Sequence, residues 1–159
     1  MKELVETLII QNKSISTMES CTGGGLVNAI TNIPNASKVI SMSVVTYSNE
    51  AKIKMGVSKD TIDKYSVYSN EVAKEMAKCV SELAHSSYGI GVTGKLKRID
   101  ENNLYGEDDL VHYAIYDQEN DIYYTESIKV TYDNRIDNKG QVIDNITSKL
   151  LEIISKNQK

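Results

Sequence analysis

Two polar side chains about thirty residues apart could together perform nucleophilic chemistry. Ser20 stands just before the run Gly23, Gly24 and Gly25, and Lys52 follows downstream. A serine hydroxyl needs a base, and neither histidine of the chain is a convincing one. A lysine amine can take that role when desolvation or positive potential destabilises its ammonium form. The sequence therefore predicts a site with Ser20 as nucleophile and Lys52 as its base.

The glycine run after Ser20 indicates a tight turn between a strand and a helix. Such a turn directs backbone N–H groups and the positive end of a helix dipole at one small volume, where an anion or an oxyanion could lie. The N–H groups of Thr22, Gly23 and Gly24 are the candidate donors. The turn could equally serve packing alone. Cys21 could be a thiol nucleophile or a small packing residue.

The elements that position these residues follow from hydrophobic periodicity and turn signals. They are a helix ending near Asn12, strand 15–20, helix 24–31, strand 39–47, a helix capped by Asn49 and ended by Gly56, helix 59–65, a long helix capped by Ser69, strand 88–93, strands 110–116 and 122–132, and a final helix through 143–153. The long helix is expected to bury Val72, Met76, Val80 and Leu83. This order predicts a three-layer α/β/α sandwich with a mixed, mostly parallel sheet and a C-terminal antiparallel hairpin.

This topology is expected to bring Ser20 and Lys52 together. If the first two strands are parallel neighbours, their carboxyl ends lie at the same sheet edge, where open α/β sheets bind ligands. Ser20 leaves one strand there, Tyr47 leaves the other, and Lys52 follows within a helical turn. In the first turn after Asn49, the helix dipole would lower the pKa of Lys52. Tyr47 could relay the proton or hold a substrate carbonyl.

Composition limits the classes of protein that fit. The 159 residues predict a single domain, 1–159, and the net charge of −4 argues against direct nucleic-acid binding. No apolar run is long enough for a bilayer span, and the N-terminus lacks the apolar core of a signal peptide, so we expect a cytoplasmic protein. Cys21 and Cys79 are too few for a disulfide framework or a zinc site, and no residue cluster has metal-ligand spacing.

Four motifs resemble the C-terminal domain family of the competence/damage-inducible protein CinA, whose active members are nicotinamide mononucleotide deamidases. The motifs are 19–24, 45–52 with 56–57, 68–77 and 90–94. The resemblance implies an α/β/α homo-oligomer that binds a small nucleotide, needs no cofactor, and hydrolyses a carboxamide to an acid with release of ammonia. It implies Ser20 as nucleophile, Lys52 as base and Tyr47 as an assisting hydroxyl. Substrate contacts would come from Thr22, Gly23, Gly24, Thr93, Gly94 and Arg135.

The chain departs from the family pattern after Gly94 and after Arg135. Residues 95–103 replace a loop rich in glycine and proline, and Lys139 stands where the family tends to have a second arginine. A lysine cannot make the bidentate contact of an arginine. These departures leave two alternatives open. One is a catalytically impaired homologue that binds a nucleotide or a protein partner. The other hydrolyses a different amide, with Lys95, Lys97 or Arg98 contacting an anion.

Overall fold

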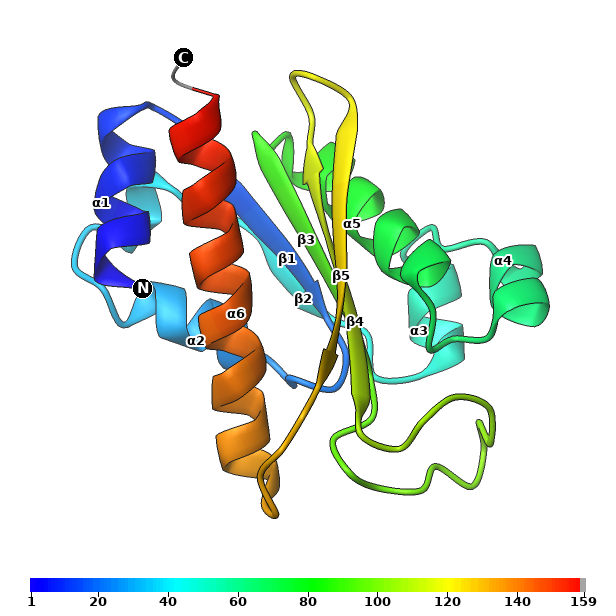
Figure 1. Cartoon of the computed structure of the whole chain (residues 1–159). Helices are drawn as coiled ribbons and strands as arrows, with labels where there is room; N and C mark the ends of the chain where they lie inside the picture. Colours follow the sequence, from blue (N-terminus) through cyan, green and yellow to red (C-terminus); the bar gives the residue numbers. More distant parts are fainter. Residues whose placement is uncertain (158–159) are drawn as a thin grey trace.

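Five short strands form one open sheet in the computed structural model, which describes residues 1–157 (Figure 1). The strands are β1 (Ile15–Glu19), β2 (Ser43–Val45), β3 (Tyr88–Gly94), β4 (Leu110–Asp117) and β5 (Ile122–Lys129), in the spatial order β2-β1-β3-β4-β5. β1 pairs in parallel with β2 and β3, whereas β4 is antiparallel to both β3 and β5. The predicted mixed sheet and C-terminal hairpin are confirmed, with the four pairings divided evenly between parallel and antiparallel.

Helices cover both faces of the sheet, which confirms the predicted three layers. α1 (Lys2–Ile10), α2 (Gly25–Thr31) and α6 (Arg135–Lys156) lie together on one face, and α3 (Asn49–Lys54), α4 (Lys59–Tyr65) and α5 (Asn70–Ala84) lie on the other (Figure 1). The first face buries Leu8 and Ile146 in one apolar cluster, and the second buries Met18 and Met76 in another. The long helices α5 and α6 each contribute an apolar stripe to these clusters, whereas the short helix α3 buries Lys52 alone.

The long helix α5 shows how the sequence sets this packing. Val72, Met76 and Val80 are fully buried, as their spacing predicts. Leu83, predicted on the same face, is 49% exposed and lies one residue before the end of the helix at Ala84. A Cβ added at Gly91 of β3 would lie 2.6 Å from the Ala77 backbone nitrogen of α5. Glycine therefore allows this helix to pack closely on the strand.

Two strands are shorter than their sequence pattern predicts. Within the predicted strand 39–47 only β2 (Ser43–Val45) pairs, and a short 3₁₀ helix, η1 (Ala36–Lys38), precedes it. Val39 lies in the segment that connects η1 to β2. Its side chain is buried, and its carbonyl accepts a 2.7 Å hydrogen bond from the Ile15 N–H. Likewise β5 ends at Lys129, before Tyr132. Burial of branched side chains does not by itself require a strand.

The parallel pairing brings three chain segments to one edge of the sheet. Glu19 at the end of β1 is in register with Val45 of β2 and Val92 of β3. Ser20, Thr46 and Thr93 follow these residues directly. Among residues 1–157, no helix is both long and apolar enough to cross a lipid bilayer.

Candidate functional site

Ser20 begins the turn that links β1 to α2. Its N–H donates to the Val92 carbonyl over 3.1 Å, and its own carbonyl accepts from the Gly23 N–H over 2.9 Å. Gly23 and Gly24 have φ values of +60° and +89°, a region that side chains disfavour. The glycines therefore let the chain reverse sharply and fix the Ser20 backbone at the sheet edge.

Lys52 reaches this serine from α3. Its Nζ donates to Ser20 Oγ over 2.9 Å and to the Thr46 carbonyl over 2.7 Å, and the residue is 1% exposed. Burial lowers the pKa of Lys52 to about 8. The structure thus brings the predicted nucleophile and base into hydrogen-bond contact. The Thr46 carbonyl, which no sequence pattern singled out, orients the amine.

The cap of α3 differs from the predicted one. Ser48, not Asn49, is the N-cap, and its Oγ accepts from the Ala51 N–H over 3.1 Å. The Ser48 hydroxyl satisfies an orphan N–H of the first helical turn, which is the role predicted for the Asn49 side chain one residue later. Lys52 consequently lies one position deeper in the helix than predicted. Desolvation, not the helix dipole, is therefore the main cause of its lowered pKa.

Tyr47 turns toward α6. Its hydroxyl oxygen accepts a 3.2 Å hydrogen bond from Arg135 Nη2, and the residue is 63% exposed. Among residues 1–157 the structure shows no hydrogen bond from Tyr47 to Ser20 or Lys52. Tyr47 and Arg135 therefore form a hydrogen-bonded pair at the rim of the site. A proton relay through Tyr47, as predicted, would need a contact with Ser20 or Lys52 that the described residues do not show.

The glycine-rich turn carries its own anion. Glu19 is fully buried, and its two carboxylate oxygens accept from the N–H groups of Leu26 and Val27, each over 2.9 Å. The Leu26 and Val27 N–H groups in the first turn of α2 are thus already satisfied by the protein's own carboxylate. Within the turn 21–24, the Gly23 N–H is bonded to the Ser20 carbonyl, and the N–H groups of Cys21, Thr22 and Gly24 have no hydrogen-bond partner among residues 1–157. A buried acidic residue directly before the serine was the signal that sequence reasoning missed.

α6 lies over the same turn. A Cβ added at Gly23 would be 3.4 Å from Lys139 Nζ, and one added at Gly25 would be 3.2 Å from Ile143 Cδ1. The helix begins after its N-cap, Asn134, so Arg135 and Lys139 lie four residues apart on one helical face. Two cationic side chains therefore border the serine-containing turn.

Thr93 and Gly94 serve packing in this structure. Thr93 is fully buried and its hydroxyl donates to the Val67 carbonyl over 2.9 Å. A Cβ added at Gly94 would be 2.5 Å from Val111 Cα, so glycine there permits the pairing with β4. Both residues lie at the sheet edge that carries Ser20, but close packing accounts for their types.

The remaining polar groups near Ser20 differ in what they can do. Burial raises the pKa of the Cys21 thiol to about 12, so it stays protonated at neutral pH and is a poor nucleophile. The hydroxyls of Thr22 and Thr46 are buried and find no hydrogen-bond partner within residues 1–157. In the same part of the chain, no three His, Cys, Asp or Glu side chains are grouped as metal ligands would be.

The family model and the similar proteins found by comparison point to the same family. The CinA C-terminal domain family matches residues 1–106. A protein of Caldanaerobacter subterraneus subsp. tengcongensis, whose name describes it as competence-damage inducible, is 50% identical over 96 residues. A CinA-like protein of Endomicrobium trichonymphae is 47% identical over 89 residues. These matches cover 59% and 55% of this chain but only 23% and 21% of the relatives, so the chain spans about a quarter of their length.

Solved structures extend the likeness to the C-terminal third. A CinA superfamily protein of Klebsiella pneumoniae 700603 has the same fold, with a TM-score of 0.90 at 23% identity over 98% of this chain and 95% of that one. A CinA superfamily protein of Escherichia coli gives 0.86 at 26% identity over 96% and 87%. Residues 107–157, which lie beyond the family match, therefore keep the same architecture.

Proposed function

The chain belongs to the CinA C-terminal domain family, and we propose that it is an amidohydrolase that converts nicotinamide mononucleotide to nicotinate mononucleotide and ammonia. The observation that carries this proposal is the buried 2.9 Å contact between Lys52 Nζ and Ser20 Oγ. A lysine with a pKa near 8 is partly neutral at physiological pH, so it can accept the hydroxyl proton.

The reaction would run through an ester on Ser20. Ser20 Oγ attacks the carboxamide carbon while Lys52 takes the hydroxyl proton. The C–N bond then breaks, and Lys52 returns that proton to the leaving ammonia. Water attacks the ester carbon with Lys52 again as base, which releases the acid and regenerates the serine. The free N–H groups of Cys21, Thr22 and Gly24 are the nearest candidates for stabilising the oxyanion.

The charges around the turn support a substrate with a phosphate. Arg135 and Lys139 lie on α6 beside the turn, and neither forms an ion pair within the described residues 1–157. A cationic pair facing a glycine-rich turn favours an anionic group on the substrate, and nicotinamide mononucleotide carries both a phosphate and a carboxamide. As part of the same proposal, we expect the protein to act as a homo-oligomer.

A panel of three related amides tests this assignment. Purified protein is incubated with nicotinamide mononucleotide, nicotinamide riboside or nicotinamide, and ammonia and the product acid are measured together. We expect the highest kcat/KM with the mononucleotide and a large loss without its phosphate. If the phosphate makes no difference, the nucleotide assignment is wrong although the Ser20–Lys52 chemistry can stand.

A catalytically impaired homologue remains the second candidate. The observation favouring it is the small opening to the serine, since Ser20 is 7% exposed in this structure. Calorimetric titration with nicotinamide mononucleotide would select it if binding occurs with no ammonia release. The remaining alternative, hydrolysis of a different amide, named Lys95, Lys97 or Arg98 as the anion contact. Lys95 and Lys97 pair with Asp108 and Asp133, which leaves Arg98 as its candidate cation.

A further inference from the structure

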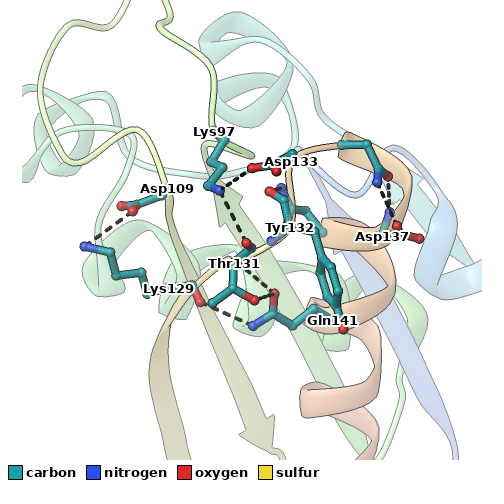
Figure 2. Close-up of polar contacts among 10 residues, drawn as sticks. Lys97, Asp109, Lys129, Thr131, Tyr132, Asp133, Asp137 and Gln141 are labelled. Atoms are coloured by element: carbon teal, nitrogen blue, oxygen red, sulfur yellow. Dashed lines mark hydrogen bonds and ion pairs between the residues drawn. The ribbon is translucent and has the colours of Figure 1, made fainter.

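The segment 95–109 departs from the family pattern, yet side chains fix its path. Lys95 Nζ pairs with Asp108 over 3.1 Å at the base of the segment, and Leu96 is buried in the core. Lys97 donates to Asp133 over 3.1 Å and to the Thr131 carbonyl over 3.3 Å, as Figure 2 shows. The segment is thus tied to the strand–helix connection that leads to Arg135.

Asp100 is the centre of a second set of contacts. Its Oδ2 accepts from the Tyr68 hydroxyl and, over 3.0 Å, from Asn103 Nδ2, while its Oδ1 accepts from the Asn102 N–H over 3.0 Å. The bond from Tyr68 holds the pKa of Asp100 below its ordinary range. A charged carboxylate therefore has a fixed position in this segment.

The Asp100 contacts continue to the helix that carries Lys52. Asn103 Oδ1 accepts a 3.1 Å hydrogen bond from Asn49 Nδ2. Asn49 begins α3 and Lys52 comes three residues later, so the two side chains lie on one face of the helix. The carboxylate is thereby linked, through Asn103 and Asn49, to the start of the helix that carries Lys52.

Few charged groups act on the Lys52 amine. The Ser20 hydroxyl and the Thr46 carbonyl contact it directly, and the Cys21 thiol is kept neutral by burial. Burial has the largest effect and lowers the pKa of Lys52, whereas Cys21 and, after it, Asp100 act in the opposite direction. The other titratable groups bordering the site are Glu19, Tyr47, Tyr68, Arg135 and Lys139.

We propose that Asp100 is a positioning residue of the Ser20–Lys52 site. Its carboxylate, held by Tyr68 and Asn103, links residues 100–103 to Asn49 at the start of α3, and its negative charge favours the ammonium form of Lys52. The catalytic part of this inference rests on the proposed function, in which Lys52 is the base. The electrostatic part does not require turnover.

Asp100→Asn tests the proposal with little change in shape. The Lys52 side chain is titrated by NMR in protein labelled with ¹³C-lysine, with its signal assigned by Lys52→Arg. Removing the nearby negative charge disfavours the ammonium, so we expect the titration midpoint to fall by about half a pH unit. The acid limb of the kcat/KM profile is expected to move with it, giving about a threefold higher value below the midpoint.

Glu101→Gln is the matched control, because it removes the same charge from the neighbouring residue, which is exposed. We expect its midpoint to equal that of the wild type. Tyr68→Phe provides a second variant in case Asp100→Asn does not fold. It releases the carboxylate without removing it, and the midpoint is expected to fall by a smaller amount.

The outcomes separate this inference from the proposed function. A lower midpoint in Asp100→Asn with no ammonia release in any variant supports the placement of Asp100 and removes only the hydrolase assignment. Equal midpoints in the wild type, Asp100→Asn and Tyr68→Phe would overturn the inference. An equal fall in Glu101→Gln would also overturn it, because the effect would then be one of net charge.

Discussion

Lys52 Nζ lies 2.9 Å from Ser20 Oγ, and both residues are buried where two parallel strands end. Among residues 1–157 no carboxylate forms an ion pair with this lysine. Burial without such a partner is what brings its pKa to about 8. Burial makes the amine a usable base because it favours the neutral form. For the same reason, protonating Lys52 lowers the free energy of unfolding, and both effects can be measured.

The pH dependence of activity should report Lys52. A general base must be neutral, so log kcat/KM is expected to rise with unit slope up to about pH 8 and then level off. At pH 7 the value should be about tenfold below the plateau. Steady-state ammonia release between pH 6 and 10 measures this. A flat profile across pH 8 would contradict the role of Lys52 as base.

The stability of the protein should also depend on Lys52. Its pKa is lowered from 10.5 to about 8 on folding, so between these pH values the unfolded chain binds more protons. Stability therefore increases as the pH rises from 8 to 10.5, by roughly 3 kcal/mol from this residue. Denaturant unfolding of the wild type and Lys52→Met across that range measures the difference. The variant should lack this increase, and equal slopes would mean that Lys52 is not desolvated.

Glu19 is expected to be essential to the turn that holds Ser20. In Glu19→Gln only one side-chain oxygen remains, so one N–H of Leu26 or Val27 loses its buried acceptor. We expect a loss of about 1–3 kcal/mol in unfolding free energy, measured by urea denaturation. Glu50→Gln is the control, because Glu50 is exposed in the first turn of α3 and its substitution should be close to neutral. Similar stability for both variants would rule out the capping role of Glu19.

Two glycines provide opposite predictions for the same substitution. A Cβ at Gly91 would lie 2.6 Å from the Ala77 nitrogen and 2.7 Å from Met76 Cβ, so Gly91→Ala should destabilise the fold by about 1–3 kcal/mol or more. A Cβ at Gly140, inside α6, meets nothing within 4 Å, so Gly140→Ala should stabilise by about 0.5–1 kcal/mol. Thermal unfolding of both variants checks the pair. A stable Gly91→Ala protein would show that α5 and β3 are not packed this closely.

The sequence predicted the parts of the fold that depend on periodic burial. The stripe Val72, Met76 and Val80 identified α5, and the predicted strand 122–132 identified β5, which ends earlier, at Lys129. It predicted the second strand too long, because Val39 is buried without pairing in a strand. Local sequence patterns predict which side chains are buried, but they do not predict which backbone groups form hydrogen bonds between strands.

The site was predictable where it depends on strand order and unpredictable where it depends on side-chain direction. Parallel neighbours place Ser20 and Lys52 at one edge, and the structure has them in contact. The spacing could not show that Tyr47 turns toward Arg135, or that Asp100 bonds to Tyr68 from a loop thirty-two residues away in sequence. Such contacts arise from the tertiary arrangement and leave no local signature.

The most direct test of the central claim is ammonia release from nicotinamide mononucleotide by the wild type, Ser20→Ala and Lys52→Met. Lys54→Met serves as the control, since Lys54 lies on the same helix with an exposed side chain. Circular dichroism establishes that each variant is folded. We expect both site variants to lose activity by about 10³-fold or more while Lys54→Met keeps it. A folded Ser20→Ala protein that releases ammonia at the wild-type rate would contradict the account.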